Sequence, residues 1–308
     1  MPHLCVMCLL WFAVPDMQSA PAVITALVGD VRIIRQKDTV EIAAHQLDHL
    51  FDGDSIVTGD GRATVLFRTG TFTAIKQHTA MLVTLLDADM IHAGQAVLDT
   101  DMETFARLFR EASDAENHSL ETIMAIGQDS STMTIHAPGN TALCSDRPDI
   151  LWGHVPGANW YAVTIEHRGQ ILNDIATTDT FLPYPTQHDS LGAGSYVLRV
   201  IAFHNNDSLN GRIRQFKVLT AEKIESVERC IEDIESKSPD SYTARLLSAM
   251  VYERYGLKTE AIDVYQVLVM EQPVPYLVRT LALLYAQVGM PHAAHQYYEL
   301  YRLRIQQP

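Results

Sequence analysis

Positive charge is scarce in this sequence. The 308 residues include 23 Lys and Arg against 37 Asp and Glu, a formal net charge of −14 at pH 7. No run of basic residues offsets this excess, so attachment to nucleic-acid phosphates or anionic lipid by overall charge is not expected. Apolar residues make up 47% of the chain, which is ample for packed cores and argues against wholesale disorder.

Long apolar runs are also lacking. The longest, Leu4 to Val14, spans eleven residues, whereas a membrane helix needs about 20. Its length suits the apolar part of a signal peptide, and Ala20-Pro21-Ala22 matches a cleavage site, although no Lys or Arg precedes the run. We therefore predict a signal peptide at 1–22, a mature chain from about Val23 and an exported, periplasmic protein. The alternative is a buried N-terminal strand or helix.

Cysteine is rare, and two of the four cysteines, Cys5 and Cys8, lie inside the predicted signal. Cys144 and Cys230 remain, in different predicted domains. An oxidising compartment would allow them to pair, but two buried free thiols are favoured. Cys144 and Cys230, 86 positions apart, do not have the spacing of a zinc site.

Catalytic and cofactor motifs are missing. The sequence has no G-x-S-x-G elbow, no Ser-x-x-Lys, no phosphate-binding glycine loop and no HExxH. The aspartates of one Gly-Asp corner lack the bidentate Glu of a calcium loop and are better explained as turn caps; they are Asp52, Asp54 and Asp60. Two histidine pairs lack a third ligand: His45 with His49, and His292 with His295. We expect no enzyme activity, no cofactor and no metal.

Short β-branched runs alternate with Gly-Asp turns between Ala26 and Leu85, which is typical of a compact β structure. The order "G-x-V … G-D-x-I-x-T-G … A-x-x-x-F … G" resembles the FecR-like domain of bacterial envelope proteins. The resemblance is carried by Gly29, Val31, Gly53, Asp54, Ile56, Thr58, Gly59, Ala63, Phe67 and Gly70. FecR-like domains are binding and signalling modules, so the resemblance implies a function without catalysis.

We assign this FecR-like, β-rich domain to residues 23–140. Within it, Met102, Phe105, Leu108 and Phe109 recur at helical spacing, which predicts a helical insertion at about 101–127.

Residues 145–219 predict a β-sandwich, because strands and turns alternate every 8 to 12 residues or so. The pattern "P-x-x-x-W … P-G-A-x-x-Y-x-V-x-I … L-x-x-G-x-Y-x-x-x-V" resembles immunoglobulin-like or fibronectin type III domains. It places Trp152 inward and predicts a tyrosine corner from Leu191, Gly194 and Tyr196.

Residues 221–308 predict helices with an internal repeat. Tyr, Gly, Ala and Tyr recur at offsets 0, 4, 9 and 13 from Tyr252 and again from Tyr285. This spacing resembles tetratricopeptide helical hairpins; an unrelated helical bundle is the alternative. The expected fold class is thus multidomain β + α.

Tetratricopeptide arrays bind peptides on the face formed by each repeat's first helix. The repeat register places Met250, Glu253, Tyr276 and Arg279 on that face, although plain scaffolding or dimerisation is an equal alternative. Because each β part would close its own core, removal of 221–308 is expected to leave both folded.

The combined hypothesis is a non-catalytic periplasmic module that binds or scaffolds another envelope protein, a peptide or cell-wall glycan, without nucleic acid and without a membrane span. The alternative is a FecR-type regulator that passes a signal across the membrane. That role needs a cytoplasmic domain and a full transmembrane helix, and the short apolar run supplies neither.

Overall fold

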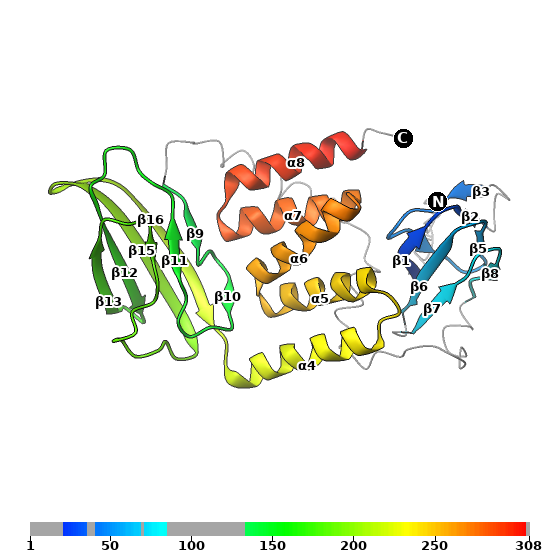
Figure 1. Cartoon of the computed structure of the whole chain (residues 1–308), viewed down its shortest axis with the longest axis horizontal. Helices are drawn as coiled ribbons and strands as arrows, with labels where there is room; N and C mark the ends of the chain where they lie inside the picture. The colour runs from blue at the N-terminus through cyan, green and yellow to red at the C-terminus, as the bar shows by residue number, and fades with distance from the viewer. Residues whose placement is uncertain (1–20, 36–40, 69–70, 85–132, 306–308) are drawn as a thin grey trace, which may run out of the picture.

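The computed structural model describes residues 21–35, 41–68, 71–84 and 133–305. They form three parts in a row, with a block of helices between two β structures (Figure 1). The chain is therefore a multidomain β + α protein, as predicted. The helical part comes last in sequence but lies in the middle of the molecule.

The first part, here called the β-lobe (described residues 21–84), contains two four-stranded antiparallel sheets. Their strand orders are β4-β1-β6-β7 and β3-β2-β5-β8. The strands are β1 Ala22–Val28, β2 Val31–Ile34, β3 Glu41–Ala43, β4 His49–Leu50, β5 Ser55–Thr58, β6 Arg62–Phe67, β7 Phe72–Ile75 and β8 Ala80–Leu82. Alternation along β6 sends Val65 and Phe67 into the core of the lobe, whereas Leu66 joins the core of the helices.

The Gly-Asp corner before β5 forms as the sequence predicted. Gly53 has φ +84°, and the carboxylate of Asp54, which is 3% exposed, accepts the Phe51 backbone N–H at 2.8 Å. It also pairs with Arg35. Asp54 is thus a turn cap whose Oδ2 receives both contacts, and the turn-cap interpretation is confirmed at this position.

Pro21 and Ala22 belong to the β-lobe. The Arg68 backbone N–H donates to the Pro21 carbonyl at 2.9 Å, and Ala22 is fully buried opposite Leu50 and Phe67. The described part of the lobe therefore includes Pro21 and Ala22, which precede the predicted start at Val23. The rest of the predicted signal peptide, residues 1–20, lies outside the described residues.

The second part is a β-sandwich. A five-stranded sheet, β10-β16-β15-β12-β13, faces a three-stranded sheet, β14-β11-β9. The strands are β9 Ile135–Ala137, β10 Ala142–Leu143, β11 Ile150–Trp152, β12 Trp160–His167, β13 Gln170–Thr177, β14 Phe181–Leu182, β15 Gly194–His204 and β16 Asp207–Val218.

Both sequence-predicted aromatic features of the sandwich are confirmed. Trp152 is 2% exposed and meets Tyr161 edge-on, with ring centroids 5.5 Å apart. The Tyr196 hydroxyl donates to the Gly192 carbonyl at 2.6 Å, which ties β15 to the turn before it.

The boundary between the β parts differs from the prediction of 140/145. Residues from Met133 onward belong to the sandwich, because Met133 and Ile135 lie in its core and β9 pairs with β11. A three-residue strand such as β9 carries too little pattern to be assigned from sequence. The predicted helical insertion at 101–127 lies outside the described residues.

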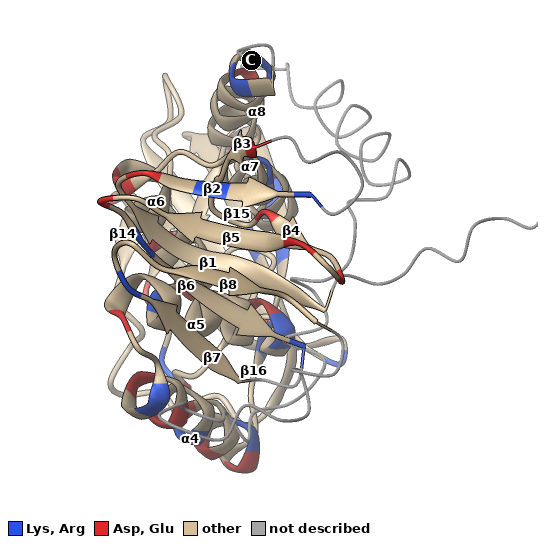
Figure 2. Ribbon diagram, turned by 90° about the vertical axis from the view of Figure 1, so that its right-hand side faces the viewer, with Lys and Arg blue, Asp and Glu red and all other residues tan. Residues whose placement is uncertain are grey.

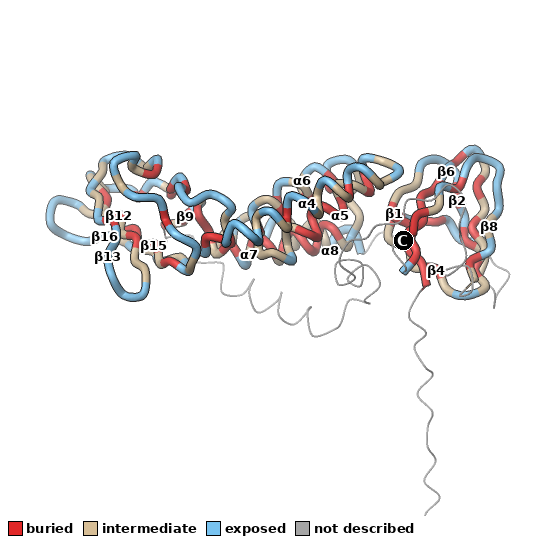
Figure 3. The backbone as a smooth tube through the Cα atoms, turned by 90° about the horizontal axis from the view of Figure 1, so that it is seen from below, coloured by how far each residue is buried: buried red, intermediate tan, exposed pale blue. Residues whose placement is uncertain are grey.

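The third part is a stack of five helices: α4 Ala221–Lys237, α5 Ser241–Tyr255, α6 Lys258–Glu271, α7 Pro275–Val288 and α8 Pro291–Ile305. The predicted turn glycines are confirmed, since Gly256 ends α5 and Gly289 ends α7 in the left-handed conformation (φ +76° and +87°). The repeated alanines Ala261 and Ala294 are fully buried, which lets consecutive helices approach closely. Figure 3 colours the chain by burial, and buried residues recur along each helix of the stack.

The helices share a core with the β-lobe. Val23, Leu66 and Phe72 are at most 2% exposed and belong to the hydrophobic core of the helices. A buried hydrogen bond from the Thr243 hydroxyl to that of Thr25 (3.0 Å) joins α5 to β1 beside them.

Asp240 links the same two parts at the start of α5. One carboxylate oxygen caps the Thr243 backbone N–H at 2.8 Å, and the other accepts the Thr64 hydroxyl at 2.9 Å. The β-lobe and the helices therefore form one packed unit.

The sandwich holds the opposite ends of the helices. Thr141 accepts the Lys258 N–H at 2.9 Å, and the Ala142 N–H donates to the Gly256 carbonyl at 2.8 Å. Arg214 donates to the Gly289 carbonyl at 2.9 Å. Both turn glycines thus serve as docking points for the sandwich.

The two cysteines of the described residues are not buried as predicted. Cys144 and Cys230 form no disulfide, as favoured, but Cys144 is exposed and Cys230 is half-buried. In the described part of the chain, no helix combines the length and hydropathy needed to span a bilayer.

Candidate functional site: a cleft between the β-lobe and the helices

A cleft of about 980 Å³ lies where the β-lobe meets α5 and α6. Its size is at the upper end of the range for small-molecule sites. Its floor is the helix-facing side of β1, β6 and β7, which lie side by side in the sheet (Figure 2). The packed half of this face carries Leu66 and Phe72, and the other half is left open to the cleft.

Small side chains make the floor flat. Ala26, Thr64 and Ala74 come from three adjacent strands and all line the cleft. Ala74 is exposed on the edge strand β7. A bound chain could therefore approach the sheet closely at this point.

The helical wall carries a two-pronged ion pair. Arg245 on α5 donates to both carboxylate oxygens of Glu271 on α6, each at 2.7 Å. The hydrogen bonds to Arg245 lower the pKa of Glu271 and those to Glu271 raise the pKa of Arg245. Both residues line the cleft, so the pair fixes the wall in place.

Two buried polar groups on the lining lack a hydrogen-bond partner within the described structure. They are the side-chain oxygen of Gln46, a residue 6% exposed, and the hydroxyl of Tyr242, a residue 9% exposed. Burial, followed by the charge of Glu271, raises the pKa of Tyr242, so the phenol is neutral. An unmade hydrogen bond in a buried position costs about 1–3 kcal/mol, and because each of these oxygens exposes less than 1 Å², a ligand would bond them only after a local shift of the lining.

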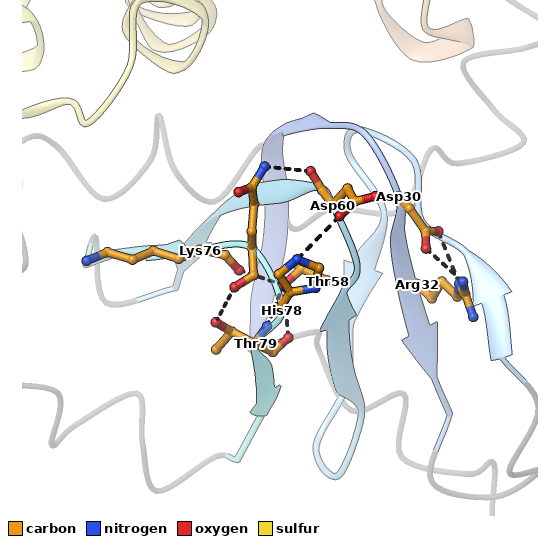
Figure 4. Close-up of polar contacts among 8 residues, drawn as sticks. Asp30, Arg32, Thr58, Asp60, Lys76, His78 and Thr79 are labelled. Carbon is orange, nitrogen blue, oxygen red and sulfur yellow. Dashed lines mark hydrogen bonds and ion pairs between the residues drawn. The ribbon is translucent and has the colours of Figure 1, made fainter.

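The far rim of the cleft is a rigid corner of the β-lobe (Figure 4). Gln77 donates to the Asp60 carbonyl at 2.9 Å, and the Thr58 hydroxyl donates to the Lys76 carbonyl at 2.6 Å. His78 lies 3.3 Å from the Asp60 carboxylate. The Lys76 side chain extends away from this cluster (Figure 4). The Thr58 hydroxyl therefore fixes the backbone of Lys76 but not its ammonium group.

The four residues predicted to form a partner groove are not together on an open face. Met250 is fully buried and Arg279 is 4% exposed, whereas Glu253 and Tyr276 are half-buried. Glu253 accepts the Tyr265 hydroxyl at 2.6 Å. Because α5 and α7 lie inside the stack, their sides pack against neighbouring helices. Met250 and Arg279 therefore offer almost no surface to a ligand.

Sequence reasoning missed the cleft because its walls come from distant segments. Tyr242 and Arg245 are about 170 to 220 residues from the strands they face, and the Arg245–Glu271 pair joins two helices. The one local signal is Asp240, recognisable as a helix cap three residues before Thr243. Across residues 21–35, 41–68, 71–84 and 133–305, no three His, Cys, Asp or Glu side chains are grouped to hold a metal ion.

No family model matches the chain, and no curated protein matches it. Among solved structures, it is similar to CopC from Methylosinus trichosporium OB3b, at 14% identity and a TM-score of 0.23, over 30% of this chain and 95% of that one. It is also similar to a fibronectin type III domain of the human KIAA0970 protein, at 13% identity and a TM-score of 0.22, over 36% of this chain and 88% of that one. These scores carry no functional argument, and the sandwich is assigned from its own sheet topology.

Proposed function

We propose that this chain is an exported, non-catalytic envelope protein that binds another protein, a peptide or cell-wall glycan in the cleft between the β-lobe and the helices. The observation that carries the proposal is a cleft of about 980 Å³ with fixed walls and an exposed floor at Ala74, beside two buried polar groups, Gln46 and Tyr242, that lack a partner within the described structure. A pre-formed cleft of this size with a few polar groups on its lining is the usual form of a binding site.

The surrounding architecture supports a binding role. The cleft walls are fixed by the Asp240 cap, by the Arg245–Glu271 pair and by a shared hydrophobic core. A pre-formed site loses little conformational entropy when a partner binds. The FecR-like motif and the tetratricopeptide-like spacing favour the same class of function, and the apolar run with its Ala-Pro-Ala sequence favours export.

The test is to block the cleft without disturbing either core. Ala74→Trp places an indole on the exposed floor, and Ala80→Trp places the same group at an exposed position on β8 that does not line the cleft. Each purified variant is used as bait in envelope extract and in a sedimentation assay with isolated cell-wall glycan. We expect Ala74→Trp to lose its partner while Ala80→Trp and the wild type retain it, all with the same Tm. Equal retention by both variants would place the binding surface elsewhere.

Export is tested separately by the mass of the protein recovered from a native-like host. Loss of the first twenty or so residues and recovery with the periplasmic fraction are expected. An intact Met1 on cytosolic protein would contradict the proposal.

A further inference from the structure

A second concave region lies at the other end of the helices. It lies where β16 runs into α4, a junction that can be followed in Figure 1. Two adjoining hollows of about 630 and 420 Å³ share Lys217, Tyr255 and Gly256. Together they form a groove across the end of β16, the first turns of α4 and α6 and the last turn of α5. This groove is separate from the cleft proposed above, and the two have no lining residue in common.

The charge of the groove is opposite to that of the chain. Its described lining residues include five cations and no carboxylate: Arg214, Lys217, Lys223, Arg254 and Lys258. The whole chain carries a net charge of −14, with 37 acidic residues. Five cations without one acidic neighbour on the lining are therefore a marked local concentration of positive charge.

Two of these cations are held partly buried without an ion pair in the described structure. Arg214 spends two of its five N–H groups on the carbonyls of Gly289 (2.9 Å) and Ile213 (3.2 Å), and its buried Nε has no partner. Burial, and then the nearby Arg212, lower the pKa of Arg214; burial alone lowers the pKa of Lys258. Desolvated positive charges of this kind would be stabilised by a bound anion.

The remaining groups suit an anion with several oxygens. Ser195 and Gln215 also line the larger hollow, together with Asn140 and Thr141, whose side chains are already hydrogen-bonded to the carbonyls of Gln287 and Gly256. The first backbone N–H of α6, that of Lys258, is already capped by the Thr141 hydroxyl at 2.9 Å, so the helix terminus adds only the positive end of its dipole. Arg254 lies over the Tyr255 ring, 5.9 Å from its centroid, which orients its guanidinium at the smaller hollow.

We propose that this groove binds a ligand with two or more phosphate groups. Arg214 and Lys258 receive one group in the larger hollow, Lys223 and Arg254 receive another in the smaller hollow, and Lys217 lies between them. Phosphate is favoured over carboxylate because the cations reach the groove from four elements, which matches oxygens on several sides of one centre rather than two oxygens in a plane.

The experiment uses the full chain and inorganic pyrophosphate as the probe, with affinity measured by titration calorimetry. Lys217→Gln/Lys223→Gln removes two exposed cations, one shared by the hollows and one from the smaller hollow. The matched control, Arg168→Gln/Arg304→Gln, removes two exposed cations that line neither hollow. We expect the first pair to weaken binding by about tenfold or more, since charge-assisted bonds to phosphate are lost, and the control pair to bind as the wild type does.

Salt and ligand comparisons sharpen the test. The affinity for pyrophosphate should fall when NaCl is raised from 50 to 200 mM. The size of the fall should be on the order of that expected when two or three cations contact the ligand. Failure to bind millimolar pyrophosphate, an equal loss in the control pair, or citrate binding as tightly as pyrophosphate would overturn the proposal. Co-sedimentation with vesicles containing cardiolipin, whose headgroup carries two phosphates, that the double variant loses would identify a lipid headgroup as the source of phosphate. Pyrophosphate binding without vesicle binding would identify a soluble phosphate-bearing ligand.

Discussion

Phe72→Ala tests whether the β-lobe and the helices are one cooperative unit. Phe72 is 2% exposed and lies on β7 of the β-lobe, yet its ring belongs to the core of the helices. Removing a buried phenyl ring costs about 3–5 kcal/mol, because transfer free energy is lost and a cavity remains. If the core is shared, this cost falls on the helices as well as on the sheet.

The assay is urea unfolding followed by circular dichroism at 222 nm, which reports mainly on the helices, together with hydrogen exchange of α5 and β1. Phe67→Ala is the matched control, because Phe67 is 1% exposed on the opposite face of the same sheet, within the β-lobe's own core. Phe72→Ala should lower the unfolding free energy of the helices by about 3–5 kcal/mol and reduce protection in α5.

A helical transition unchanged by Phe72→Ala, alongside a measurable cost in the β-lobe for Phe67→Ala, would refute the shared core. The same reasoning revises the expected effect of removing residues 221–308. That truncation would uncover Val23 and Leu66 as well as Phe72, so the β-lobe should not remain folded alone as the sequence suggested.

Four further predictions concern single residues. Trp152→Ala should destabilise the sandwich by about 3–5 kcal/mol, and solvent-exposed indole fluorescence from Trp152 in the native state would contradict its burial. Tyr196→Phe should cost about 1 kcal/mol by removing the 2.6 Å bond to Gly192, measured by urea unfolding. Gly53→Val should lower the Tm through strain at φ +84°; unchanged melting would refute this. Burial raises the pKa of Glu260, so the stability from its protonated form is lost as pH rises through that pKa, and Glu260→Gln should raise the Tm at pH 7 but hardly at pH 4.

Local sequence patterns predicted the elements of this fold well. The Gly-Asp corner at Gly53, the tyrosine corner at Tyr196 and the helix ends at Gly256 and Gly289 each depend on a few adjacent residues with one demanding backbone geometry. Such positions leave a strong signal because few residue types can satisfy them.

The contacts between the three parts of the molecule could not be predicted from the sequence. The prediction that Met250 and Arg279 face a groove followed from repeat spacing, which gives the phase of a helix but not what packs on each side of it. Likewise, Thr25 and Thr243 are 218 positions apart and bond directly. Neither hydroxyl differs, in sequence, from an ordinary exposed threonine.

The positive charge of the groove formed by the two hollows could not be predicted from the sequence either. Arg214 and Lys217 lie on β16, Lys223 in the first turn of α4, Arg254 in the last turn of α5 and Lys258 at the start of α6. Read separately, these are ordinary positions: a cation near a helix C-terminus is favourable, and lysines on a strand are usually solvated. The chain therefore has no basic run, and its sequence argued against any positively charged surface. Because the sandwich meets the helices at their ends, three helix termini and one strand end converge, and their scattered cations become neighbours. The net negative charge argues against electrostatic attachment of the whole protein surface to an anionic partner. It does not prevent the fold from bringing several cations together in one groove.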